Sequence, residues 1–180
     1  MMKLATGILL FAAVMPAQEI PNPLMTVSKN IYGLAKGDIL GSVDKIPDNL
    51  WSYQPTKDVR TVAQLFAHIA DGQYEFCGVA AEGKSVSKNV EKTAKSKAEI
   101  VAALKEAFAY CDAAYAKMTD ANAAEIVPFF GMKVTKLGIM DFNIAHTMEH
   151  YGNLVTYMRL NNIVPPSSEQ RPPAPKKKQD

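Results

Sequence analysis

The stretch KLGIMDFNIAHTMEHYGNLVTYMRL, residues 136–160, has the strongest helical pattern in this chain of 180 residues. Its apolar side chains recur every three or four positions, and Ile139 and Leu154 mark one face as the inward one. His146 and His150 share that face, because four residues turn an α-helix by about 400°. The stretch therefore predicts a core helix with two inward-facing imidazoles one turn apart.

Three further segments show helical periodicity, at about residues 24–43, 61–80 and 97–118. A turn and two longer loops separate the four segments, and we find no convincing strand. The residues expected to face inward are Leu24, Val27, Ile31 and Leu34 in the first segment, Val62, Leu65, Phe66, Ile69, Gln73, Phe76 and Cys77 in the second, Ile100, Leu104, Phe108, Cys111 and Tyr115 in the third, and Ile139, Phe142, Asn143, His146, His150, Leu154 and Tyr157 in the fourth. We therefore expect an all-α fold, a single four-helix bundle.

The first residues are typical of a secretion signal. Lys3 supplies a positive start, residues 4–15 form an apolar run, and cleavage is expected after Ala17. The run is too short to span a bilayer as a stable helix, which needs about 20 residues. We therefore expect residues 1–17 to be a signal peptide and the chain to be exported, to the periplasm or beyond. An uncleaved, membrane-tethered start is the alternative.

The last residues, 165–180, are rich in Pro and Lys and have no large apolar side chain. Such a segment cannot bury enough surface to fold, so we expect a disordered tail after a domain over residues 18–164. Removing the +1 of Lys3 and the +2 of the tail from the net charge of +2 leaves −1 for that domain. A basic face for nucleic acid is therefore not indicated.

The chain has three histidines, and the third, His68, lies beside Leu65 and Ile69 on the inward face of the second predicted helix. Burying three unsatisfied imidazoles would cost several kcal/mol, and a shared metal ion removes that cost. His68, His146 and His150 are therefore candidate ligands for one divalent ion, and zinc, nickel, copper and iron all suit imidazole. Three protein ligands leave a coordination position open, as in catalytic sites. The alternative is that the histidines are buried without metal and donate to carbonyls.

Four further residues are candidates for supporting the site or lining a pocket beside it. Two are amides about one helical turn from a histidine, one is a carboxylate three residues after a histidine, and one is an inward-facing tyrosine. In that order they are Asn143 and Asn153, Asp71, and Tyr157. An amide can orient an imidazole, and a carboxylate can bind a metal or accept a proton. For Asp71 the alternative is a solvated surface charge, and the catalytic residues themselves stay unknown.

The two cysteines, Cys77 and Cys111, lack the close spacing of a zinc knuckle or a redox CxxC motif. In an exported protein they could form a disulfide. Their estimated depths in the second and third helices match only if those helices run parallel. We favour the simpler interpretation of two buried thiols that behave as small apolar side chains.

Three stretches resemble the DinB-like family of metal-binding four-helix bundles. TVAQLFAHIA, residues 61–70, is similar to the family's second helix, in which an apolar run leads into a ligand histidine. NIAHTMEHYGNL, residues 143–154, is similar to its last helix with an HxxxH pair, and IPDNLWSYQP, residues 46–55, resembles its first connector. The resemblance covers about residues 24–164. It implies a crossover connection with parallel second and third helices, and a metal site made of the three histidines.

Members of this family include metal-dependent thiol transferases and isomerases that use low-molecular-weight thiols, beside many proteins of unknown activity. The resemblance therefore implies a metal-dependent enzyme that acts on a small molecule by thiol-dependent transfer or by hydrolysis. The alternative is a non-catalytic periplasmic bundle that binds metal or a partner. We expect a small-molecule substrate, which could be a thiol, but no nucleic acid and no stable membrane span. The chain could also form a homodimer.

Overall fold

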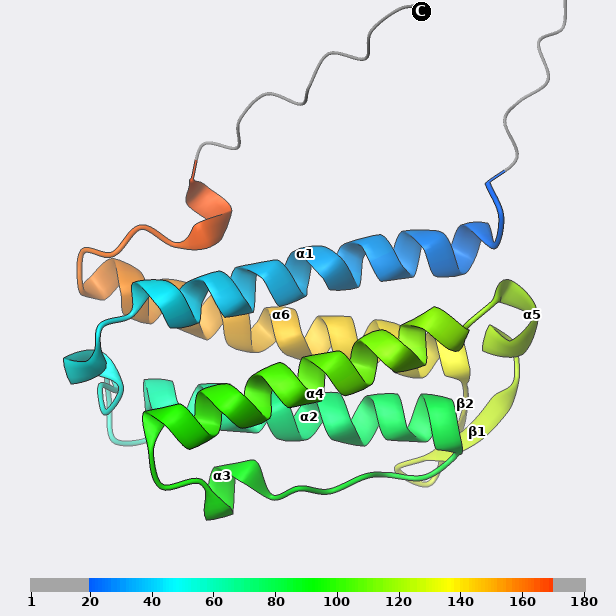
Figure 1. The fold of residues 1–180 in the computed structure, drawn as a ribbon, viewed down its shortest axis with the longest axis horizontal. Helices are drawn as coiled ribbons and strands as arrows, with labels where there is room; N and C mark the ends of the chain where they lie inside the picture. The colour runs from blue at the N-terminus through cyan, green and yellow to red at the C-terminus, as the bar shows by residue number, and fades with distance from the viewer. Residues whose placement is uncertain (1–19, 170–180) are drawn as a thin grey trace, which may run out of the picture.

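Four long helices dominate the computed structural model, which describes residues 20–169 (Figure 1). They are α1 (Pro23–Lys45), α2 (Val62–Glu82), α4 (Lys97–Lys117) and α6 (Lys136–Leu160). Each of their ends lies within two residues of the predicted boundary, and the expected all-α four-helix bundle is confirmed. No helix in the described range is long and apolar enough to cross a membrane.

The helices α2 and α4 run in the same direction (Figure 1). The chain therefore returns along the bundle between them, through an extended segment and the one-turn helix α3 (Val90–Thr93). The 3-10 helix η1 (Asp48–Leu50) lies between α1 and α2, and the short helix α5 (Asp120–Ala123) follows α4. The expected crossover with parallel second and third helices is thus present. It leaves α2 in contact with both α4 and α6.

Side-chain caps fix where the two site-bearing helices begin. The hydroxyl of Thr61 accepts from the backbone N–H of Gln64, and the Gln64 side chain accepts from the backbone N–H of Thr61. This reciprocal pair satisfies two N–H groups that an α-helix leaves free at its start. Thr135 caps α6 with a single bond of this kind, in which its hydroxyl accepts from the backbone N–H of Gly138. The caps set the positions of the histidines along α2 and α6.

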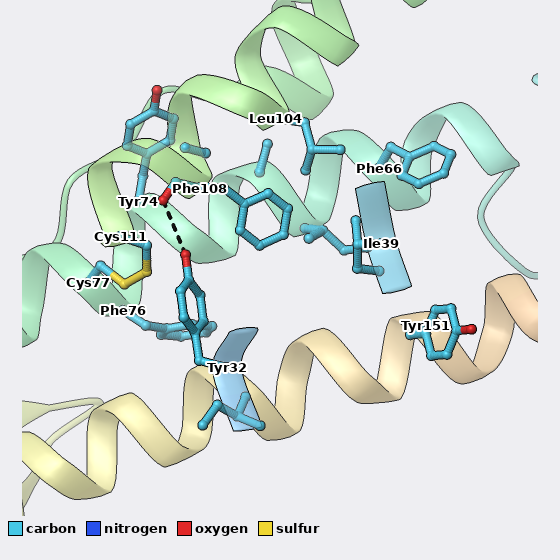
Figure 2. Packing of buried hydrophobic residues seen from close by; sticks show 14 of the residues in the cluster. Tyr32, Ile39, Phe66, Tyr74, Phe76, Cys77, Leu104, Phe108, Cys111 and Tyr151 are labelled. Carbon is cyan, nitrogen blue, oxygen red and sulfur yellow. Dashed lines mark hydrogen bonds between the residues drawn. A yellow bond between two sulfur atoms is a disulfide. The ribbon is translucent and has the colours of Figure 1, made fainter. Parts of the chain in front are cut away.

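The inward face of α1 differs from the predicted one. The four residues expected in the core are 45–58% exposed: Leu24, Val27, Ile31 and Leu34. Met25, Tyr32 and Ile39 are buried instead, at intervals of seven residues. The Tyr32 hydroxyl lies 3.1 Å from the backbone carbonyl oxygen of Phe108 (Figure 2), which anchors this face against α4. Both of these faces of α1 have helical periodicity. Choosing the more hydrophobic face as the buried one therefore gave the wrong prediction.

A β-hairpin between α5 and α6 corrects the expectation of no strand. It consists of β1 (Ile126–Phe129) and β2 (Met132–Thr135), which pair antiparallel. Each strand has only four residues, which is too short for a clear alternation of apolar and polar positions. Pro128 also argued against a strand, but a proline is tolerated in an edge strand, and both strands of an isolated hairpin are edges.

The two cysteines form a disulfide in the core between α2 and α4 (Figure 2). The Cα atoms of Cys77 and Cys111 lie 5.3 Å apart, and both residues are fully buried. The parallel arrangement of the two helices brings the cysteines to the same depth, as their positions in the sequence required. Our preference for two separate thiols was therefore wrong.

The first part of the expected tail is ordered. The 3-10 helix η2 (Pro166–Ser168) packs against α1. The backbone N–H of Ser167 donates to the Tyr151 hydroxyl of α6 at 3.0 Å, and the Tyr151 hydroxyl lies 2.8 Å from Oγ of Ser167. Residues 166–168, which we expected to belong to a disordered tail, thus pack on the bundle. The predicted signal peptide and residues 170–180 lie outside the described residues.

Candidate metal centre

Three imidazoles meet between α2 and α6. His68 comes from α2, and His146 and His150 come from α6. The Nε2 atoms of His68 and His146 lie 3.2 Å apart, and those of His146 and His150 lie 3.1 Å apart. The three candidate ligand nitrogens all lie within 4.8 Å of one another. In a tetrahedral zinc site, nitrogens about 2.05 Å from the ion lie about 3.3 Å from each other, close to the two shorter spacings.

A glycine on α2 allows this close approach. A Cβ atom at Gly72 would lie 2.6 Å from Cε1 and 2.9 Å from Nδ1 of His146. Such contacts are far inside van der Waals distance, so any side chain here would displace the His146 imidazole from its present position. The His146 ring also packs edge-on against Phe76, with ring centroids 5.1 Å apart. Packing against α2 thus fixes the position of His146.

A carboxylate fixes the tautomer of His68. The Nδ1 atom of His68 lies 3.1 Å from Oε2 of Glu91. An ionised carboxylate can only accept, so Nδ1 bears the hydrogen and neutral His68 has a lone pair on Nε2. That lone pair points at His146. The pairing of a carboxylate with the far nitrogen of a ligand histidine is common in metal sites, where it orients the ring and raises its basicity.

Two contacts position Glu91 itself. The Nε–H of Arg60 donates to Oε1 of Glu91 at 2.9 Å. The Asp71 carboxylate accepts from the backbone N–H groups of Val90 and Glu91 at 2.7 and 3.0 Å, and so caps the start of α3. Asp71 therefore supports His68 indirectly, because it caps α3, the helix that carries Glu91. It neither reaches the histidines as a ligand nor stands as a free surface charge.

The two histidines of α6 are neutral at physiological pH. Burial, with smaller contributions from the neighbouring His150 and His68 and from Arg60, lowers the pKa of His146 to about 3. Burial is also the main cause that lowers the pKa of His150. A neutral imidazole retains the lone pair that a metal needs. The electrostatics of the site thus keep both side chains in the ligand form.

The three nitrogens fit a cation better than they fit a set of hydrogen bonds. Because His68 has a bare Nε2, a hydrogen on Nε2 of His146 can satisfy one neighbour well but not both. A hydrogen on Nε2 of His150 would leave the lone pairs of His68 and His146 facing each other. One divalent ion would accept all three lone pairs at once. The Nδ1 atoms of His146 and His150 are buried without a hydrogen-bond partner among the described residues, so no carboxylate orients these rings.

None of the remaining predicted support residues forms a hydrogen bond with an imidazole among the described residues. The Nδ2 group of Asn143 donates to Oε1 of Gln73 at 3.0 Å and lies 3.5 Å from Sγ of Cys111, so it faces the core. Asn153 is exposed on α6. The Tyr157 hydroxyl donates to the backbone carbonyl of Arg60 at 2.9 Å. Tyr157 thereby tethers the residue that holds Glu91 and supports the site indirectly.

Glu91 and Arg60 are the residues that sequence reasoning missed. Glu91 lies in the segment 81–96, whose many Lys, Ser and Glu residues indicate a solvated connection, and no helical spacing relates it to His68. The crossover brings it to the site, because the connection must run back along α2. One feature of the sequence could have pointed to this arrangement. Asp71 is a carboxylate three residues after His68, and such a group needs hydrogen-bond donors, which the start of α3 supplies.

Comparison with protein families and solved structures gives a consistent result. The family model described as the DinB superfamily matches residues 34–154, well over half of the chain. The fold is similar to that of a DinB-like protein from Bacillus subtilis, with a TM-score of 0.65 and 20% sequence identity over 84% of this chain and 100% of that one. A DinB-like protein from Bacillus cereus has a TM-score of 0.65 and 17% identity, over 77% of this chain and 93% of that one.

A third similar structure is a mycothiol-dependent maleylpyruvate isomerase. Its TM-score is 0.60 at 12% sequence identity, and the match covers 72% of this chain but only 60% of that protein. At these identities the likeness shows the fold alone. No curated protein sequence matches the chain.

Proposed function

This chain belongs to the DinB superfamily, and on that basis we propose that it is a metal-dependent enzyme that acts on a small molecule. His68, His146 and His150 would bind one divalent ion. The observation that supports this most directly is the convergence of three Nε2 atoms from two helices, two pairs of them 3.1–3.2 Å apart. The reaction class we propose is thiol-dependent transfer, with hydrolysis as the second candidate.

Each part of the site has a separate role in this proposal. An ion bound by the three histidines would supply Lewis acidity, which activates a thiol sulfur or a water oxygen as a nucleophile. Three protein ligands leave room for that nucleophile. Glu91 keeps the Nε2 lone pair of His68 directed at the centre, and Phe76 shields one side of His146 from water. A thiol is favoured because one of the similar folds is a protein named as mycothiol-dependent.

The proposal can be tested with protein purified without a histidine tag. Zinc, nickel and iron forms are incubated with a low-molecular-weight thiol and an aryl chloride electrophile, and thioether formation is followed by absorbance. A rate above the uncatalysed background, lost on chelation and restored by metal, is expected. Stoichiometric metal without turnover of thiols or of ester substrates would instead favour the non-catalytic metal-binding module.

Replacing Glu91 with glutamine should weaken metal binding by roughly 10–100-fold, the usual effect of removing a carboxylate behind a ligand histidine. A neutral amide can present its N–H₂ group to Nδ1 and so permit the wrong tautomer of His68. The dissociation constant is measured by competition with a chromophoric chelator. Glu99→Gln is a matched control, because Glu99 is an exposed glutamate at the start of α4. Equal affinities for the two variants would contradict the role of Glu91.

We also propose that the chain is exported, which the disulfide between Cys77 and Cys111 supports, because buried disulfides persist mainly in oxidising compartments. Mass spectrometry of the natural protein should find a mature start near Gln18, and cell fractionation should place it outside the cytoplasm. An intact Met1 on protein in the cytoplasmic fraction would refute both expectations.

A further inference from the structure

The tip of the β-hairpin has an aromatic residue in an unfavourable backbone conformation. The register pairs Phe129 with Met132, so Phe130 and Gly131 are the two turn residues. Both have positive φ, 46° and 77°. A two-residue turn of this kind favours Asn-Gly, because a bulky L residue at positive φ is strained. Phe130 is 67% exposed, so burial of its side chain does not compensate for the strain.

Phe130 is the outer end of a continuous series of rings that reaches the histidines. Its ring centroid lies 4.2 Å from that of Phe129. The Phe129 ring contacts Phe76 at 5.8 Å and Phe142 at 5.5 Å. Phe76 in turn packs against His146 at 5.1 Å. A continuous series of apolar rings thus runs from His146 to the tip of the hairpin.

One exposed ring of this cluster, that of Phe142, lies one helical turn from His146. Phe142 precedes His146 by one turn on α6, so the two side chains leave the same side of the helix about 6 Å apart. We expected Phe142 to face inward, yet it is 45% exposed. We call the exposed parts of Phe142 and Phe130, with Phe129 between them, the aromatic surface.

We propose that the aromatic surface binds an apolar, ring-containing group of the small molecule whose reacting end lies at the three histidines. This inference rests on the proposed function and names the substrate class. Strain at a bulky residue persists where function requires it, and here the strained Phe130 contributes mainly exposed apolar area at the outer end of the ring series. Phe76 links these rings to His146, and Phe142 lies one helical turn from His146, so a ring on the aromatic surface and a reacting end at the histidines can belong to one small molecule. The aromatic surface then selects substrates with a ring a few bonds from the reacting atom.

The test uses zinc-loaded protein and two hydroxamates that bind metal through the same group. One is 3-phenylpropanohydroxamate and the other is propanohydroxamate, and calorimetry gives both dissociation constants. The ratio of the two constants isolates the contribution of the ring, and the change in that ratio on mutation cancels differences in metal affinity. Phe130→Asn should reduce the preference for the phenyl compound by about fivefold, the scale of a lost ring contact. Phe142→Ala should reduce it at least as much.

Phe130→Asn should at the same time raise the melting temperature of the metal-free protein by about 2–4 °C, because asparagine tolerates positive φ. A purely structural role of Phe130 predicts a fall instead. Ile126→Asn is the control: Ile126 is 59% exposed in the same hairpin and pairs with Thr135 at the end away from the turn, so its ratio should equal that of wild type.

The outcomes separate this inference from the proposed function. Zinc bound at one ion per chain with an unchanged ratio in both phenylalanine variants would overturn the inference alone. Protein that retains no zinc would overturn both. An unchanged ratio together with a shift from dimer to monomer in light scattering of Phe130→Asn would assign the aromatic surface to contact between two copies of the chain, and would also contradict the inference.

Discussion

Replacing His150 with alanine is expected to reduce bound metal from about one ion per chain to below a tenth of that value. Removing a group behind a ligand already weakens metal affinity 10–100-fold, and removing a ligand itself should weaken it more. The two remaining imidazoles, His68 and His146, cannot compensate, because the chain has no other histidine. Elemental analysis of untagged protein after dialysis measures the effect.

Thermal unfolding provides a second readout of the same variant. An ion that binds only the folded state stabilises it by about 2.7 kcal/mol at a concentration 100 times the dissociation constant. For a domain of this size, that corresponds to a rise in melting temperature of roughly 5–11 °C. Wild-type protein should show this rise on addition of zinc, and His150→Ala should not. Asn153→Ala, an exposed position on the same helix, is the control and should behave as wild type. Unchanged stoichiometry in His150→Ala would rule out the three-histidine site.

The helices and the clustering of the three histidines could be predicted because they depend on local pattern. Thr61 and Thr135 precede amphipathic segments, and the spacing of His146 and His150 alone places them on one face. The convergence of His68 with that pair needed the additional assumption that both faces point inward. The structure brings the three imidazoles together as expected.

The parts that failed depend on contacts between distant segments. For α1, the buried face contains a tyrosine and two serines, whereas the exposed face is richer in aliphatic residues. Tyr32 is buried because its hydroxyl finds a partner on α4, which no pattern within α1 reveals. Glu91 is similar, since its approach to His68 follows from the path of the crossover. Asn143 faces inward as predicted, but its amide donates a hydrogen bond to the Gln73 side chain and does not orient an imidazole.

The disulfide should be one of the largest single contributions to the stability of the fold. Cys77 and Cys111 are separated by 34 residues, and cross-linking a loop of that length restricts the unfolded chain by about 4 kcal/mol in the chain-entropy model. The loop contains α3 and Glu91, so the bond also limits how far the crossover can move from α2 in partly unfolded states. Both residues are fully buried, and reduction will therefore require unfolding.

Unfolding wild-type protein in the presence of a strong reductant should lower the melting temperature by roughly 8–15 °C, the equivalent of about 4 kcal/mol in a domain of this size. A chelator is present throughout, so that metal binding does not contribute to the measured stability. Reduced wild type keeps both sulfur atoms and isolates the effect of the cross-link. Cys77→Ala/Cys111→Ala should be at least as unstable, because it also loses packing in the core. Its melting temperature should not respond to the reductant. Two free thiols in denatured, unreduced wild type, with no effect of reductant on its melting temperature, would show that the bond does not form.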